Sequence, residues 1–94
     1  MQAFALPAVL THAQANACVA AFRAHLGAGS GSAVDASALQ QFDSAALAVL
    51  LACRRLALER GMALQVVGLS TRLQALAGLY GVQALLGAQP VSQG

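Results

Sequence analysis

Nine consecutive apolar residues, 45–53, constrain the fold of this 94-residue chain more than any other feature. They follow Asp43 and Ser44, two residue types that favour helix N-caps, and they lead into a charged stretch that Gly61 ends. This pattern predicts a helix over residues 45–60. Because its first turns are apolar on every side, the helix must be covered on more than one face. The run is too short to span a membrane, which takes about 20 residues.

A second helix is predicted earlier in the chain, over residues 12–26. Thr11 and Gln14 stand three residues apart, as in a capping box, and Gly27 is placed to end the helix. Apolar residues recur at spacings of three and four, which indicates a buried stripe. The stripe comprises Ala15, Cys18, Val19, Phe22 and Leu26.

A third helix is predicted to end at Gly81. Thr71 with Gln74 is a second capping-box match, and Ser70 is an alternative N-cap. The stripe that we expect to be buried comprises Leu73, Leu76, Ala77 and Tyr80.

Three segments are predicted to be strands. Residues 1–10 form the first, in which Pro7 marks an edge position or a strand end. Residues 33–36 form the second. Residues 62–67 are almost continuously apolar, which is typical of a central strand in a parallel sheet.

The order of these elements is β-α-β-α-β-α, with residues 37–42 as a turn and residues 82–86 as a last short strand or turn. Helices that alternate with strands predict parallel βαβ units with right-handed crossovers. We therefore expect an α/β fold with a small, mostly parallel sheet and three to four helices.

The composition favours a protein with a protein partner. Charged residues make up 9% of the chain, against about 25% in an ordinary soluble domain. So apolar a small chain either buries most of its surface or has a partner that covers part of it, and we take the composition as a first indication of a subunit. The five basic residues are all Arg and are spread along the chain, and the aromatic residues lie far apart, which argues against a nucleic-acid-binding surface.

Few side chains are suited to catalysis. The acidic residues and histidines are Asp35, Asp43, Glu59, His12 and His25. Ser44 lacks the G-x-S-x-G context of a nucleophilic serine. The Gly-rich segment 27–32 follows a helix and lacks the Lys of a phosphate-binding loop. We expect neither an enzyme nor a cofactor.

The two cysteines and the N-terminus favour the cytoplasm. Cys18 and Cys53 lack the spacing of metal ligands, and they are expected to be buried thiols in a reducing compartment. The first basic residue is Arg23, so the charged start of a signal peptide is missing.

The turn Asp43-Ser44-Ala45 is the candidate regulatory site. A cap at this position stabilises a helix by about 1 kcal/mol, which by itself explains Asp43 and Ser44. The functional alternative is that a phosphate or an acidic group of a partner docks at the helix N-terminus, which carries partial positive charge.

Four stretches, taken in order, resemble a STAS domain. They are Val-Asp-Ala-Ser-Ala-Leu at 34–39, Phe-Asp-Ser-Ala-Ala-Leu at 42–47, Leu-Gln-Val-Val-Gly at 64–68 and Leu-Gln-Ala-Leu-Ala-Gly-Leu-Tyr-Gly-Val at 73–82. The resemblance covers about residues 10–86 and implies a STAS-like fold. Residues 1–94 are then one domain, and residues 87–94 are its C-terminal tail.

Two branches of that family differ at the turn. Anti-sigma factor antagonists carry Asp-Ser-Ser-Gly-Leu, in which the second Ser accepts a phosphate. This chain has Ala45 at the position of that Ser and Ala46 at the position of the Gly. The STAS subunit of the Mla phospholipid transporter tends to show Asp-Thr/Ser-Ala-Gly-Leu, with Leu-Tyr near the end of the last helix. The Asp-Ser-Ala turn and Leu79-Tyr80 resemble that branch more closely.

The resemblance implies a non-catalytic cytoplasmic subunit of Gram-negative bacteria that binds the ATPase subunit of an ABC transporter for phospholipids. It would meet the membrane only through that complex. The implied contact residues are Asp43, Ser44, Ala45, Ala46, Leu47, Thr71 and Arg72. The alternative is an antagonist that binds a kinase-type anti-sigma factor and uses Ser44 as phosphoacceptor. An open sheet edge could also pair two copies as a homodimer.

Overall fold

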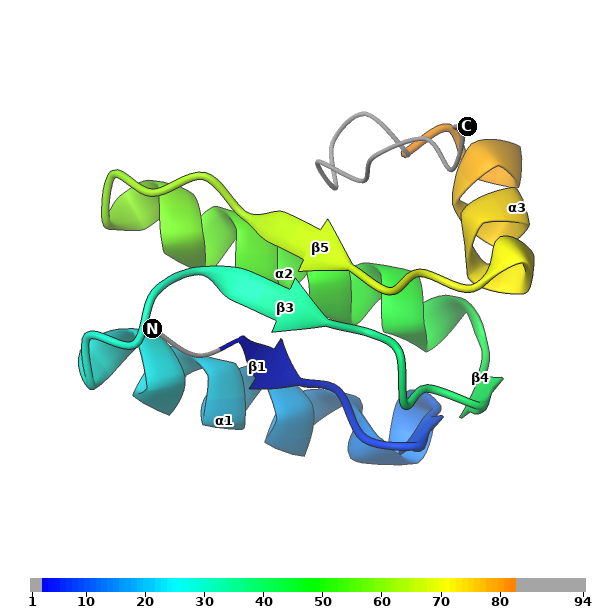
Figure 1. The fold of residues 1–94 in the computed structure, drawn as a ribbon. Coiled ribbons are helices and arrows are strands. Elements are labelled where there is room, and N and C mark those ends of the chain that lie inside the picture. The colour runs from blue at the N-terminus through cyan, green and yellow to red at the C-terminus, as the bar shows by residue number, and fades with distance from the viewer. Residues whose placement is uncertain (1–2, 83–94) are drawn as a thin grey trace.

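Three short parallel strands organise the fold (Figure 1). The computed structural model describes residues 3–82. Its main sheet has the strand order β1-β3-β5. Along the chain, α1 connects β1 to β3, and α2 lies between β3 and β5. The bounds are β1 Phe4–Ala5, α1 Ala15–Gly27, β3 Ala33–Asp35, α2 Ser44–Glu59 and β5 Gln65–Val67. Because right-handed crossovers that advance in one direction place their helices on one face, α1 and α2 both lie behind the sheet in Figure 1.

A second, smaller parallel ladder extends the fold beyond the main sheet. It pairs β2 (Val9–Leu10) with β4 (Gln41–Phe42). The predicted strand 1–10 is therefore divided, and the predicted turn 37–42 contains a strand. The division falls at Pro7, which has no N–H to donate to a ladder. The Ala8 carbonyl next to it accepts hydrogen bonds from the N–H groups of Gln40 and Gln41.

Helix α1 begins and packs as its sequence predicts. A short 3-10 helix, η1 (His12–Gln14), precedes it, and the Gln14 side chain accepts a hydrogen bond from the Thr11 N–H at 2.9 Å. The stripe faces the core, with Cys18, Phe22 and Leu26 buried and the other two members half-buried. The predicted helix 12–26 is thus confirmed, with its first turn wound more tightly.

Helix α2 is covered on more than one face, as its apolar composition requires. Its buried side chains are Ala46, Leu47, Val49, Leu50, Cys53 and Ala57. They pack under the sheet and against α1. Gly61 then adopts a φ of 73°, a left-handed conformation that glycine tolerates and that ends the helix.

The strand β5 is not central, contrary to the expectation from its apolar sequence. Within residues 3–82 it lies at one end of the sheet, and β3 is the central strand. Of the run 62–67 only the last three residues form the strand, and they alternate, with Val66 buried and Val67 51% exposed. The apolar residues before them pack as a connection, since Leu64 is buried and Met62 half-buried.

Helix α3 (Thr71–Leu79) begins one residue earlier than its leading capping-box match predicts. The N-cap is Ser70, whose hydroxyl oxygen accepts a hydrogen bond from the Leu73 N–H at 3.1 Å. Leu73 and Ala77 are buried as expected. Tyr80 is not, because it follows the last helical residue, and its side chain is 57% exposed. Of the predicted element 82–86, residues 83–86 lie outside the described residues, as does the tail.

Ser70→Ala is expected to lower the free energy of unfolding by about 1 kcal/mol, because the Leu73 N–H loses its acceptor. Thr71→Ala is the matched control, since Thr71 is exposed and already inside the helix. Urea denaturation of both variants measures the difference. The reverse order of the two losses would show that Thr71 is the cap.

Candidate functional site

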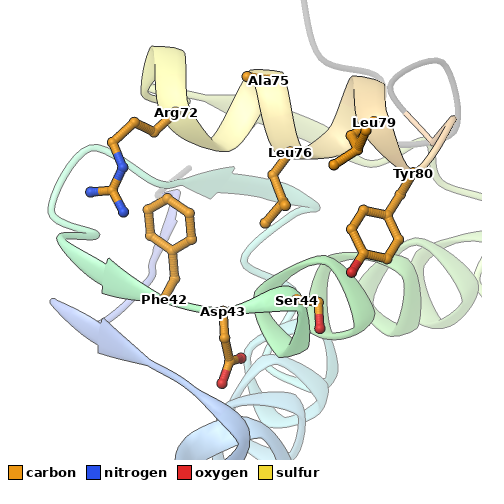
Figure 2. A pocket seen from close by; sticks show the side chains of 8 residues that line it. All are labelled: Phe42, Asp43, Ser44, Arg72, Ala75, Leu76, Leu79 and Tyr80. Carbon is orange, nitrogen blue, oxygen red and sulfur yellow. The ribbon is translucent and has the colours of Figure 1, made fainter.

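The candidate site is a groove at the edge of the sheet where the strands end. The chain leaves β4 into the N-terminus of α2, and it leaves β5 into α3, so two segments far apart in sequence meet there. The groove has a volume of about 500 Å³. Its lining comprises Phe42, Asp43, Ser44, Arg72, Ala75, Leu76, Leu79 and Tyr80 (Figure 2). Ligands of open α/β sheets commonly bind at this carboxyl edge.

Asp43 has a structural role at this edge. One oxygen of its carboxylate accepts a hydrogen bond from the Ala45 N–H at 2.8 Å, which caps α2. The other oxygen lies 3.4 Å from the His12 N–H at the start of η1, which donates to it. A single carboxylate therefore serves the N-termini of two helices, where negative charge is stabilising. Figure 2 shows it pointing away from α3.

Ser44 is not the cap that the sequence suggests as one alternative. It is the first residue of α2, and its side chain is exposed. Within the described residues its hydroxyl makes no hydrogen bond. Because Asp43 caps the helix, the Ser44 hydroxyl is not needed for that role.

The other turn residues lie progressively deeper. Ala45 is half-buried, whereas Ala46 and Leu47 are buried in the core, with exposed fractions of 0% and 3%. Ala46 and Leu47 hold the start of α2 against the core. They do not line the groove, and they affect it only by fixing the position of Ser44.

Arg72 lies on the facing wall of the groove. Its guanidinium carbon is 5.0 Å from the centroid of the Phe42 ring, a cation–π distance that ties α3 to β4. Thr71 precedes it and is exposed, but it does not line the groove. Of the residues predicted from sequence, the structure thus brings Asp43, Ser44 and Arg72 together.

Sequence reasoning missed the larger half of the groove. Leu79 is 81% exposed, the largest exposed fraction among the big apolar side chains of residues 3–82, and Tyr80 beside it is 57% exposed. Figure 2 shows Leu76 and Tyr80 reaching from the α3 side toward α2. In the sequence, Leu79-Tyr80 is a family signature and Tyr80 also belongs to the stripe that was expected to be buried. The pair is far from the Asp43 turn in sequence, so its place in the same groove was not predicted.

The turn after β5, which leads into α3, is closely packed. Gly68 there has a φ of 75°, and a Cβ on it would lie 2.9 Å from the Ser37 backbone nitrogen and 3.0 Å from an Asp35 carboxylate oxygen. Hydrogen bonds from the side chain and the backbone N–H of Ser37 lower the pKa of Asp35. The ends of β3 and β5 are therefore packed backbone against backbone.

The remaining reactive groups lie away from the groove. Both cysteines are buried and unpaired. Burial raises the pKa of Cys18, and burial together with the nearby Cys18 raises the pKa of Cys53 to about 12, so both are inert thiols. In the part of the chain that the structure describes, no three His, Cys, Asp or Glu side chains are placed to share a metal ion. No helix there has the length and hydropathy of a membrane span.

Comparison with protein-family models matches residues 3–87 to the family described as Mlab, STAS domain. No curated protein matches the chain. The matched stretch runs from the start of β1 past the end of α3, so it includes both walls of the groove. The α/β architecture with its small parallel sheet agrees with a STAS-like fold. This chain belongs to the STAS domain family and is of the Mlab type.

Proposed function

We propose that this chain is a non-catalytic accessory subunit that binds the ATPase subunit of an ABC transporter for phospholipids, and that the groove between α2 and α3 is the contact surface. The single observation that carries the proposal is the exposure of Leu79 and Tyr80 beside the Asp43 turn. The Mlab type of the matching family supports an accessory role in such a transporter.

Two physical arguments favour a protein as the occupant. Large apolar side chains gathered at an exposed groove mark protein-interaction sites, and an exposed Leu beside an exposed Tyr is a typical anchor. The groove is also open enough to admit a side chain or a helix edge of a partner.

The proposed contact residues divide by depth. Ser44, Arg72, Leu79 and Tyr80 would touch the ATPase, with Thr71 at the rim. Asp43, Ala45, Ala46 and Leu47 would act by holding the head of α2 in place. In this arrangement the subunit stabilises or regulates the ATPase by contact. It would reside in the cytoplasm and be held at the inner membrane only by the complex.

Co-expression with the ABC transporter ATPase of the same operon tests the proposal. We expect the two proteins to co-purify and to elute as one peak in size-exclusion chromatography, with light scattering reporting the number of copies. ATP hydrolysis by the ATPase should depend on the bound subunit. Separate elution at micromolar concentration, with unchanged hydrolysis, would contradict the proposal.

The exposed Ser44 hydroxyl favours a second candidate, an anti-sigma factor antagonist. In that function Ser44 would take the phosphate that Ala45 cannot accept. Incubation with a kinase-type anti-sigma factor and ATP, followed by intact-mass measurement, tests it. An unchanged mass would remove this candidate.

A further inference from the structure

Arg72 carries a positive charge that the described residues leave unpaired. The residue is exposed, and the only interaction that it makes there is the approach of its guanidinium to the Phe42 ring. A cation–π contact uses the positive charge of the guanidinium and leaves its N–H groups able to donate hydrogen bonds. Phe42 therefore holds the group in place while its N–H groups stay available.

Asp43, the acidic residue that lines the groove, does not neutralise the charge of Arg72. Among residues 3–82, Asp43 is the one carboxylate that lines the groove, and both of its oxygens face helix N–H groups, those of Ala45 and His12. Its side chain points away from α3 (Figure 2). The end of the groove at Arg72 is therefore positive.

The other end of the groove is apolar. Leu76, Leu79 and Tyr80 follow one another at spacings of three and one along α3 and its end, and two of them are more than half exposed. An occupant that matches both ends must present an apolar side chain and, next to it, a carboxylate.

From these observations we infer that the groove takes a short amphipathic segment of a partner protein, whose apolar side chain lies on Leu76, Leu79 and Tyr80 and whose Asp or Glu carboxylate pairs with Arg72. This inference rests on the proposed function and specifies the chemistry of the ATPase segment. An anionic lipid head group is a poorer match, since surfaces that bind anionic membranes cluster about four to eight basic residues, whereas the described lining of the groove holds one.

A charge-removal variant with a matched control tests the inference. The affinity of the purified ATPase subunit is measured by isothermal titration calorimetry for the wild type, Arg72→Gln and Arg55→Gln. Arg55 is an exposed arginine near the far end of α2, outside the groove, so its variant makes the same change in net charge. We expect Arg72→Gln to weaken binding about tenfold, because a carboxylate loses a charge-assisted partner, and Arg55→Gln to change it less than about twofold.

Two further measurements identify the pairing. Added salt should weaken the wild-type complex more than the Arg72→Gln complex, because salt screens the pair that only the wild type forms. Arg72→Glu should bind poorly, and an Asp→Lys or Glu→Lys change at one site of the ATPase should restore that binding. Circular dichroism of each variant shows that it is folded.

The outcomes separate the inference from the proposed function. A wild-type complex whose affinity and salt dependence are the same with Arg72→Gln overturns the inference and leaves the proposed function standing. Absence of any wild-type complex overturns both. Binding of vesicles of anionic phospholipid that is lost in Arg72→Gln, with no ATPase binding, also overturns the inference, because the carboxylate partner is then replaced by a phosphate.

Discussion

Gly68→Ala is expected to lower the free energy of unfolding by about 3 kcal/mol, from left-handed strain and a steric clash together. The backbone φ of 75° is unfavourable for alanine, and the added Cβ would lie 2.9 Å from both the backbone nitrogen and the Cβ of Ser37. Backbone atoms at the ends of two strands cannot turn aside as a flexible side chain can. The melting temperature should fall by about 12 °C or more, at roughly 4–8 °C per kcal/mol for a domain of this size.

Gly61→Ala is the matched control for this prediction. Gly61 has nearly the same φ, 73°, but a Cβ there would meet no atom within 4 Å. It should therefore show only the strain, about 1–2 kcal/mol. Thermal denaturation of both variants measures the difference, which reports the contact between the ends of β3 and β5. Equal losses in the two variants would show that this contact has no energetic weight.

The helices could be predicted well from sequence because their signals are local. Capping residues, glycines and apolar spacing all act within one or two turns, so the ends of α2 at Asp43 and Gly61 are correct within a residue. The parallel order of strands followed from the alternation of helices and strands.

The errors concern features that depend on distant partners. The strand β4 is only two residues long, and it exists because it pairs with β2, far away in sequence, where the Ala8 carbonyl accepts a hydrogen bond from the Gln41 N–H. The edge position of β5 depends on which strands pair, which the apolar run 62–67 does not encode. The exposure of Tyr80 depends on where α3 ends, a boundary that a periodic pattern defines poorly.

The candidate site shows the same division. The Asp43 turn was visible as a cap next to an unusually apolar helix, but the sequence did not separate the capping role of Asp43 from the free hydroxyl of Ser44. The α3 wall was largely missed, because Leu79 fitted no stripe and Tyr80 fitted the wrong one. The contact of Arg72 with Phe42 joins α3 to β4, two segments far apart in sequence, so no local pattern predicts it.

Leu79→Asp is expected to weaken binding to the ATPase about a hundredfold. Covering a leucine that is 81% exposed contributes about 1.5–3 kcal/mol to a complex, and an aspartate in its place would have to be desolvated without a partner. Because so exposed a side chain contributes little to folding, the melting temperature should change by no more than a few degrees. The loss of affinity would then come from the interface and not from unfolding. Isothermal titration calorimetry with the ATPase measures the affinity.

Leu58→Asp supplies the control for this last prediction. Leu58 is 50% exposed on the charged half of α2, outside the groove, so the same chemical change there tests whether any exposed leucine would give the same result. We expect its affinity to stay within about twofold of the wild type, because surface changes away from a contact are nearly neutral. If Leu58→Asp abolishes binding while Leu79→Asp does not, the contact lies on the charged half of α2, and the groove is not the docking surface.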